Sequence, residues 1–466
     1  MGTKTAEEQS DPQALLAALR SKLRADQIDT SESSLALFAH GESYSKGRKP
    51  DVVVYPESTE DVRQVVLVAR DLGAAITPVG ANSSLEGHTV PVRGGISLNF
   101  SRMDRIREIA ADDFLVVVEP GVTYPRLNEA LRSTGLFFPI DPGAEATLGG
   151  MASTNASGTM AVRYGVTSDL VMGLEVVLAS GEVIRTGGRS RKSTSGYALT
   201  KLFCGAEGTL GIITELTVKV VARPAALMGV RASFTTVGKC VDYVTELIQS
   251  GANLSRCELV DAVSIDAINR HLGMNLEVAP TVFLELGGDQ QAVETMAREA
   301  TEVAAGHGAT ACDLATGGEE LNRLWKARHQ AFYCLVAANP GLANIVTDLA
   351  VPVSRLAEVI EACTVKVEDA GMPAYVLGHV GDGNFHLTLF FKPDDAAAEE
   401  RAHEVHAELV DITLAAGGTC TAEHGVGLRK LRYVRKEHGA AVDTMWAIKR
   451  ALDPQGIMNP GKKLPA

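Results

Sequence analysis

Apolar residues near the start of the chain recur at helical spacing. Leu15, Leu19 and Leu23 lie four positions apart, and Leu16 adds to the same face. This spacing places the side chains along one side of an α-helix. Residues 1–46 are therefore expected to form a helical N-terminal arm.

A strand–helix–strand unit is predicted after the arm. The apolar runs 52–55 and 75–79 have the length and composition of strands. Between them, Ser58 with Asp61 three residues later marks a capped helix start. Gly73 is a typical helix end. The second strand leads into a loop of small residues.

The pattern then becomes rich in strands up to Arg223, where Pro224 stops a strand and indicates a domain boundary. Beyond it strands and helices alternate, which favours an antiparallel sheet with helices on one side. The expected strands are 96–100, 115–118, 174–179, 183–186, 212–221, 226–235, 281–287, 345–351, 374–379 and 385–391, and the expected helices are 238–250, 261–271, 290–306, 318–337, 354–370 and 397–416.

Residues 378–386, with the sequence GHVGDGNFH, predict a hairpin that presents two histidines. An Asp-Gly pair between apolar flanks is a strong signal for a two-residue turn. With that turn, His379 faces His386, and directly opposed Cβ atoms lie about 4.5–5.5 Å apart. Two imidazoles at this separation can share a cation. Glu423 is the expected third ligand, which leaves a position for substrate.

Glycine is enriched, with 45 residues in 466, against about 7% on average. Three glycine-rich loops, 78–87, 142–158 and 205–211, carry few bulky side chains. Successive backbone amides in such loops can bind a pyrophosphate without lysines. No loop has the spacing of a dinucleotide-binding or Walker motif. We therefore expect a nucleotide cofactor bound by another fold.

Charge and cysteine content exclude several classes of protein. The net charge of −13 and the lack of a basic run argue against nucleic-acid binding. The seven cysteines are scattered without a C-x-x-C pair, which fits reduced thiols and excludes an iron–sulfur cluster of the usual spacing. We find neither a secretory signal nor an apolar run long enough to span a membrane. The expected location is the cytoplasm, either free or peripheral to a membrane.

The segments 204–214, 378–386, 417–427 and 452–462 together resemble the FAD-linked oxidases of the vanillyl-alcohol-oxidase/p-cresol-methylhydroxylase superfamily. Within it the chain is similar to the D-2-hydroxyacid dehydrogenases, above all the cytochrome-type D-lactate dehydrogenases. The resemblance implies an α+β protein: a two-subdomain FAD-binding domain of the vanillyl-alcohol-oxidase type and an antiparallel-sheet α+β substrate (cap) domain. The implied boundaries are 1–46 for the arm, 47–223 for the FAD domain, 224–416 for the cap with its metal hairpin, and 417–466 for a segment that returns to the FAD domain.

The resemblance also assigns roles to particular residues. His379, His386 and Glu423 would hold a divalent metal, Zn²⁺ first and Mn²⁺ as the alternative. His424 would be the catalytic base. Arg328 would bind the substrate carboxylate, and Asn384 would add a hydrogen bond. The FAD contacts implied are Pro78, Gly80, Ala81, Asn82, Ser83, Ser84, Leu85, Pro142, Gly143, Thr147, Leu148, Gly149, Gly150, Ser153, Asn155, Ser157, Gly158, Gly208, Ile212, Ile213 and Asn459.

The implied reaction is oxidation of a D-2-hydroxyacid, with D-lactate favoured, to the 2-oxoacid. A metal would acidify the hydroxyl proton and a neutral histidine would accept it, while flavin N5 takes the hydride. FAD is expected to be non-covalent, because Asn82 and Ser83 stand where some relatives have a tethering histidine, and His88 lies beyond them. The electrons would pass to an external cytochrome, quinone or electron-transfer flavoprotein. A homodimer is left open.

Other functions compete with this one. D-2-hydroxyglutarate dehydrogenase and the flavin subunit of a glycolate oxidase differ only in substrate; a dicarboxylate would want a second cation, for which Arg429 and Lys430 are candidates. A metal-dependent hydrolase would explain two histidines and a glutamate but leaves the glycine-rich loops without a role. A flavin subunit inactive alone, and the redox-neutral alkylglycerone-phosphate synthases, complete the alternatives; the histidine block counts against the synthases.

Overall fold

The computed structural model describes residues 11–42 and 47–466. The chain divides into two compact units, which are described separately. The first unit contains residues up to 158, 166–223 and 423–466, and the second contains 159–165 and 224–422. The predicted N-terminal arm falls partly outside the described residues; its described part contains α1 (Pro12–Arg20) and α2 (Glu32–Leu37).

The first unit begins with a small sheet whose strand order is β1-β2-β4-β3. The strands β2, β4 and β3 run parallel, and β1 joins antiparallel to β2. Helix α3 (Thr59–Leu72) connects β2 to β3 and buries Val62, Val65 and Val66. The Ser58 side chain accepts a hydrogen bond from the Asp61 amide, as the predicted cap requires. The strands are β1 (Ile28–Asp29), β2 (Val52–Val54), β3 (Ile76–Val79) and β4 (Ile96–Asn99).

A second sheet of this unit is wholly antiparallel, with the order β5-β6-β10-β8-β9. Its inner face packs on α5 (Leu148–Thr154), with Leu148 and Met151 in the shared core. Its strands are β5 (Ile106–Ala110), β6 (Leu115–Val118), β8 (Val171–Val177), β9 (Val183–Gly187) and β10 (Ile212–Lys219), and the smaller elements around it are β7 (Leu136–Phe137), β11 (Val221–Ala222), α4 (Tyr124–Ala130), α7 (Thr167–Leu170) and α8 (Leu199–Phe203).

The last residues of the chain also belong to the first unit. Helices α15 (Leu431–His438) and α16 (Ala441–Leu452) lead to a segment in which Met458 forms a bridge with Ile76 of β3. Lys449 and Asp453 form a buried ion pair, and Asp453 also accepts hydrogen bonds from two amides of this segment. The C-terminus is thus attached to the strand that precedes the first glycine-rich loop.

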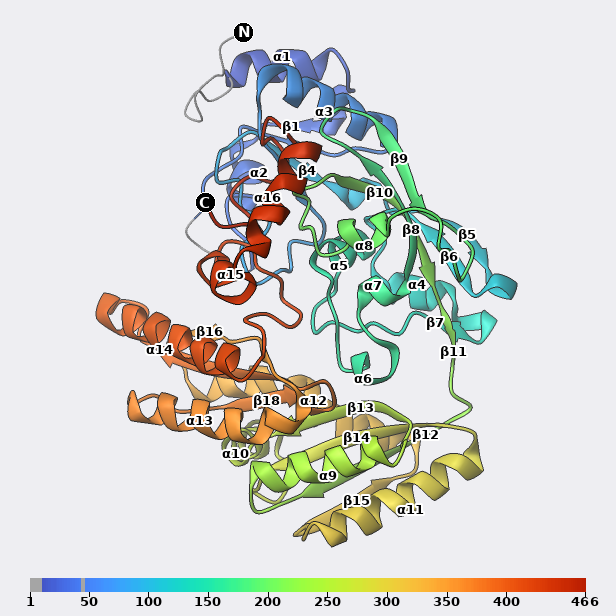
Figure 1. The fold of residues 1–466 in the computed structure, drawn as a ribbon, viewed down its shortest axis with the longest axis vertical. Coiled ribbons are helices and arrows are strands. Elements are labelled where there is room, and N and C mark those ends of the chain that lie inside the picture. Colours follow the sequence, from blue (N-terminus) through green and yellow to red (C-terminus); the bar gives the residue numbers. More distant parts are fainter. Residues whose placement is uncertain (1–10, 43–46) are drawn as a thin grey trace. The chain divides into compact units, whose positions relative to one another are not determined.

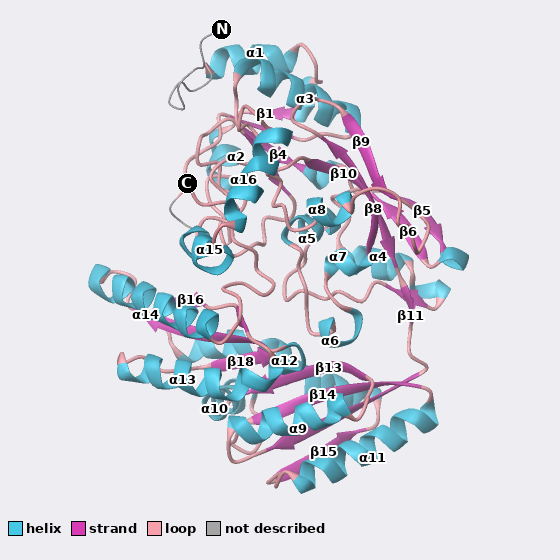
Figure 2. Cartoon of the chain, viewed as in Figure 1, coloured by secondary structure: helices cyan, strands magenta, loops and turns pink. Residues whose placement is uncertain are grey.

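The second unit is built on one large antiparallel sheet, shown by the magenta strands in the lower part of Figure 2. Its order is β15-β12-β14-β13-β18-β19-β16, and the short β17 also pairs with β19. The strands are β12 (Ala226–Ser233), β13 (Leu254–Val260), β14 (Thr281–Gly288), β15 (Ala311–Ala315), β16 (Ala343–Val346), β17 (Leu349–Ala350), β18 (Val376–His379) and β19 (Asn384–Phe391).

Helices cover both faces of this sheet, so the expectation of helices on one side is wrong. Helices α10 and α12 pack on the face that carries Val260 and Phe283. Helices α9, α11, α13 and α14 pack side by side in a separate row (Figure 1). The reason is visible in β14, where consecutive residues are buried, as in a strand covered on both sides. The helices are α6 (Ala161–Tyr164), α9 (Val237–Gln249), α10 (Ala262–Leu272), α11 (Gln290–Gly306), α12 (Gly318–Ala338), α13 (Leu356–Asp369) and α14 (Ala396–Ala415).

The histidine hairpin forms, but with a different register from the predicted one. His379 pairs with Asn384, and Leu377 pairs with His386. The connection therefore spans residues 380–383, because Val380 is fully buried and cannot flank an exposed two-residue turn. The register is shifted by two residues, and an even shift keeps a side chain on its face of the sheet. Both histidines thus stay on one face.

Among residues 11–42 and 47–466, we find no helix that combines the length and apolar character needed to cross a bilayer.

The hairpin turn provides a test of the fold. Gly383 has φ +75°, and a Cβ there would lie 2.1 Å from the Val351 carbonyl oxygen. Gly371 has φ +74° but no atom within 4 Å of such a Cβ. Gly371→Ala should therefore cost only the left-handed backbone term, about 1–2 kcal/mol, and Gly383→Ala clearly more. Urea unfolding measures both free energies; equal losses would contradict this turn geometry.

Candidate functional site

The first two glycine-rich loops contact each other in the first unit. A Cβ on Gly80 would lie 2.3 Å from Thr147 Oγ1. Thr147 is the N-cap of α5, where its hydroxyl accepts a hydrogen bond from the Gly150 amide. Only glycine at position 80 allows this approach. Two loops that are far apart in sequence thus form one backbone surface at a helix start.

The third loop joins them through close packing and one asparagine. Gly208 has φ +72°, and a Cβ there would lie 2.4 Å from Pro78 Cγ. Asn459 donates its side-chain amide to the carbonyls of His88, at 3.1 Å, and Glu207, at 2.7 Å. The backbone amide of Asn459 donates to the Ile76 carbonyl at 2.8 Å. Asn459 therefore links the C-terminal segment to the strand and two loops.

The predicted FAD residues fall into two groups. Leu148, Ile212 and Ile213 are core side chains, so only their backbones can face a ligand. The others lie in or beside the three loops: Pro78, Gly80, Ala81, Asn82, Ser83, Ser84, Leu85, Pro142, Gly143, Thr147, Gly149, Gly150, Ser153, Asn155, Ser157, Gly158, Gly208 and Asn459.

Several hydroxyl and amide groups of these loops are used internally. Ser153 donates to the Gly149 carbonyl. Asn82 and Asn155 both adopt the left-handed conformation, which asparagine tolerates better than most residues. In contrast, Ser84 Oγ and Asn459 Oδ1 are buried without a hydrogen-bond partner among the described residues. Buried polar atoms are normally paired, so these two fit a loop surface that binds a polar ligand such as FAD.

The segment that carries Glu423 and His424 packs on the first loop, within the first unit. A Cβ on Gly427 would lie 2.2 Å from the Glu86 carbonyl oxygen. His424 Nδ1 lies 3.6 Å from Glu86 Oε1, and Glu423 Oε2 accepts a 2.7 Å hydrogen bond from Ser157 of the second loop. The predicted base and the predicted FAD loops are therefore brought together by one unit.

Glu86 is a site residue that the sequence did not reveal. It is buried, and Lys430, itself fully buried, lies 3.2 Å from it. Burial alone would raise the pKa of Glu86, but the charges of Lys430 and His424 lower it to about 2. Lys430, a sequence candidate for a second substrate cation, is thus ion-paired with Glu86.

Glu207, in the third loop, is a second buried glutamate with a structural task. Its two oxygens accept hydrogen bonds from the amides of Val426, at 2.8 Å, and Gly427, at 2.9 Å. His88 and Lys463 each lie 3.5 Å from it. Burial would raise its pKa, but these charges and hydrogen bonds lower it to about 2. The sequence signal that could have indicated this role is the position of Glu207 between the glycines of the third loop.

In the second unit, polar residues form a strip across one face of the large sheet. The pairing of β13 with β18 places Glu258 opposite His379. His379 pairs with Asn384, and His386 is two residues further along the same strand and face. β16 and β17 pair with β19 in one continuous register, which places Asp348 opposite His386. Three neighbouring strands and the short segment between β16 and β17 thus contribute to one polar strip.

The two imidazoles in the strip are fixed through their Nδ1 atoms. His379 Nδ1 lies 2.6 Å from Glu258 Oε1, and His386 Nδ1 lies 2.8 Å from the Thr347 carbonyl oxygen. With the proton on Nδ1, each neutral ring carries its lone pair on Nε2. The ring centroids are 5.5 Å apart and the planes are perpendicular. Such outer hydrogen bonds are typical of histidines that bind a metal.

Of the two predicted substrate-binding residues, Asn384 lies on this strip and Arg328 contacts it from a helix. Arg328 of α12 contacts Glu258 Oε2 through Nε, at 2.7 Å, and Nη2, at 2.6 Å. Asn384 donates its amide to the Leu349 carbonyl at 2.9 Å, and its Oδ1 is buried without a hydrogen-bond partner in the described part of the chain. That oxygen is suited to accept a hydrogen bond from a hydroxyl group.

Asp348 anchors the chain just before Glu423. Its Oδ2 accepts a 2.7 Å hydrogen bond from Thr421, and its carbonyl accepts one from the Ala422 amide at 3.2 Å. Neither Asp348 nor Glu258 was predicted. Glu258 lies on β13, a strand that the sequence patterns did not indicate.

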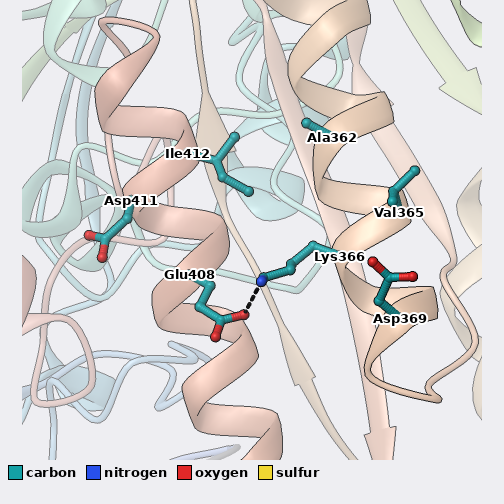
Figure 3. A pocket seen from close by; sticks show the side chains of 7 residues that line it. All are labelled: Ala362, Val365, Lys366, Asp369, Glu408, Asp411 and Ile412. Carbon is teal, nitrogen blue, oxygen red and sulfur yellow. Dashed lines mark ion pairs between the residues drawn. The ribbon is translucent and has the colours of Figure 1, made fainter.

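A pocket of about 380 Å³ lies between α13 and α14, and none of the predicted site residues lines it (Figure 3). Lys366 and Glu408 form an ion pair of 3.2 Å within it. Its lining consists of Ala362, Val365, Lys366, Asp369, Glu408, Asp411 and Ile412. It has no part in the site.

Comparison with known proteins agrees with this architecture. Residues 50–187 match the family described as FAD binding domain, and 223–463 match FAD linked oxidases, C-terminal domain. The structure of p-cresol methylhydroxylase with substrate bound aligns with a TM-score of 0.81, covering 97% of this chain and 96% of that one at 19% identity. The fold predicted from the resemblance is therefore confirmed.

Curated relatives are closer in sequence. A probable mitochondrial D-lactate dehydrogenase of Danio rerio is 41% identical, over 91% of this chain and 87% of its own length. A mitochondrial D-lactate dehydrogenase [cytochrome] of Arabidopsis thaliana is 40% identical, over 92% and 76%. The chain belongs to the FAD-linked oxidases. Within that family it is a D-lactate-dehydrogenase-like oxidoreductase with an FAD-binding domain.

The contact between the first two loops can be tested by FAD retention. Gly80→Ala places a methyl group against Thr147 Oγ1 and should separate the loops, so purified protein should lose most of its FAD. Gly188→Ala is the control, because a Cβ at this exposed glycine meets no atom within 4 Å. The ratio of absorbance at 450 nm to that at 280 nm measures FAD content. Full FAD content in Gly80→Ala would contradict the packing.

The lowered pKa of Glu207 predicts a pH dependence. Its stabilising contribution is fully present above the unfolded pKa of about 4.5 and is lost as pH falls from there towards 2. A shift of this size corresponds to about 3 kcal/mol. Glu207→Gln should therefore lower the free energy of unfolding strongly at pH 7 and much less near pH 3. Denaturant titrations at both pH values measure this; a difference independent of pH would contradict it.

Proposed function

We propose that the protein oxidises D-lactate to its 2-oxoacid and passes the electrons to an external acceptor. The observation that carries the proposal is the 41% and 40% identity to proteins named D-lactate dehydrogenase, over more than nine-tenths of the chain. The substrate loses the proton of its hydroxyl group and a hydride from the carbon that carries this hydroxyl. FAD, when bound, supplies the acceptor for the hydride.

The roles of the chain's own residues follow from their chemistry. His424 takes the hydroxyl proton, for which an imidazole near neutral pKa is suited. Glu86 Oε1 lies 3.6 Å from Nδ1 of this ring and places a negative charge beside it. Arg328 binds the substrate carboxylate. The edge of its guanidinium formed by Nε and Nη2 contacts Glu258. The other edge, between the two terminal nitrogens, is the one proposed to bind the substrate. Asn384 adds a hydrogen bond to the substrate.

A divalent metal is the second part of the proposal. His379 and His386 are its nitrogen ligands through Nε2, and Glu423 is the third ligand. Glu423 directly follows Ala422, whose amide is held by the Asp348 carbonyl, so chain continuity supports this choice. Nitrogen and carboxylate ligands suit Zn²⁺, with Mn²⁺ as the alternative. A metal held there would supply Lewis-acid chemistry at the substrate hydroxyl.

The FAD is proposed to be non-covalent and the acceptor a cytochrome. Asn82 and Ser83 occupy the part of the first loop where a tethering histidine would stand, and neither can form a histidyl link. The cytochrome is supported by the relative from Arabidopsis thaliana, which is named a D-lactate dehydrogenase [cytochrome]. Glycolate and D-2-hydroxyglutarate are the competing substrates.

A panel of D- and L-2-hydroxyacids with a dye acceptor tests the substrate. D-lactate should be turned over fastest, and a chelator should abolish turnover. His424→Ala should lose roughly 10²- to 10⁴-fold in kcat with the 450 nm absorbance retained, as expected for loss of a general base. His438→Ala, at an exposed position of α15, is the matched control. Normal turnover in His424→Ala would reject the base, and inactivity on every D-acid would reject the function.

A further inference from the structure

One buried carboxylate touches two residues to which the proposed function gives different tasks. Glu258 Oε1 lies 2.6 Å from His379 Nδ1, and Oε2 lies 2.6 and 2.7 Å from Nη2 and Nε of Arg328. We propose that Glu258 is a positioning residue that orients the side chains of both the metal ligand His379 and the substrate-binding Arg328. The inference rests on the proposed function, which assigns those two roles.

The sheet itself holds the carboxylate in place. Glu258 lies on β13 directly opposite His379 on β18, where side chains of one face stand side by side. Arg328 comes from α12, which packs on the same face. The Glu258 side chain is 0% exposed. Its position is thus determined by two paired strands and a packed helix rather than by a loop.

The two oxygens divide their partners without overlap. Both contacts of Arg328 converge on Oε2, so Oε1 is left for the imidazole of His379. When Oε1 accepts a hydrogen bond from His379 Nδ1, the proton stays on Nδ1 and the lone pair of Nε2 is available to a cation. Carboxylates play the same part behind zinc-binding histidines. Charge-assisted contacts of this kind are short and directional. A glutamine has only one acceptor oxygen, so it cannot serve both partners.

A coupled effect distinguishes this role from simple stabilisation. If Glu258 orients His379, replacing Glu258 weakens metal binding. If Glu258 also orients Arg328, the same replacement raises KM for D-lactate. The FAD loops belong to the other unit, and FAD retention should not change. A glutamate that only balances buried charge would lower the free energy of unfolding without this pair of effects.

The chain offers a matched control. Glu285 is also a buried glutamate on the same face, on the neighbouring strand β14, where it lies 3.4 Å from Arg256. It has no place in the proposed site. Glu285→Gln therefore removes a buried carboxylate of the same face whose ion-pair partner is Arg256.

The experiment measures Zn²⁺ affinity by competition with a chromogenic chelator, alongside FAD content, kcat and KM for D-lactate. Glu258→Gln should raise the Zn²⁺ dissociation constant about 10- to 100-fold and raise KM, with FAD content as in the wild type. Glu285→Gln should leave the Zn²⁺ dissociation constant within about twofold of the wild type.

Glu258→Asp covers the case in which the glutamine variant does not fold. Aspartate keeps the charge next to Arg328 but is one methylene shorter, so it cannot reach both partners, and the Zn²⁺ dissociation constant should again rise. Wild-type affinity in either folded Glu258 variant, or an equal loss in Glu285→Gln, would overturn the role of Glu258. Wild-type protein that binds no Zn²⁺ would instead overturn the proposed metal site, and with it this inference.

Discussion

The structure depends on buried carboxylates that are compensated by cations from distant parts of the chain. Glu86, Glu207 and Glu258 are buried, and removing one partner of such a pair costs about 3–5 kcal/mol. Each of them also faces a histidine: Glu86 faces His424, Glu207 faces His88, and Glu258 faces His379. Charges that hold the segments together therefore lie beside three imidazoles, and in one case, Glu258 with His379, a 2.6 Å hydrogen bond fixes the ring.

Close backbone approach is the second requirement, and it applies to the FAD loops. Gly80 and Gly208 bring three loops against one another because a side chain at either position would overlap a neighbour. Asn459 then joins the loops to the C-terminal segment through hydrogen bonds. The predicted FAD site is thus built from sequence segments that are hundreds of residues apart, and small residues make their contact sterically possible.

Local signals in the sequence predicted much of this, and long-range pairings account for the remainder. The capped start at Ser58 was predictable because its partner is three residues away. The hairpin was predictable as a turn, yet its register was wrong by two residues, because the burial of Val380 is a tertiary effect. His379 and His386 were still assigned to one face, since the error was even.

Glu258 and Glu207 could not be predicted in the same way. Glu258 pairs with Arg328 and His379, 70 and 121 residues away, and Glu207 pairs with amides about 220 residues away. No periodicity records such contacts. The missed strand β13 increased the difficulty, because without it Glu258 has no neighbours in a predicted sheet.

Zinc K-edge X-ray absorption on protein reconstituted with one equivalent of Zn²⁺ tests most directly whether the two imidazoles of the polar strip, fixed by Glu258 and by the Thr347 carbonyl, face a cation. Histidines held with Nε2 towards the cation predict two imidazole ligands, with Zn–N distances of about 2.0–2.1 Å, and one fewer imidazole in His386→Ala. A spectrum of oxygen ligands alone, or one unchanged in His386→Ala, would contradict a cation site formed on the polar strip.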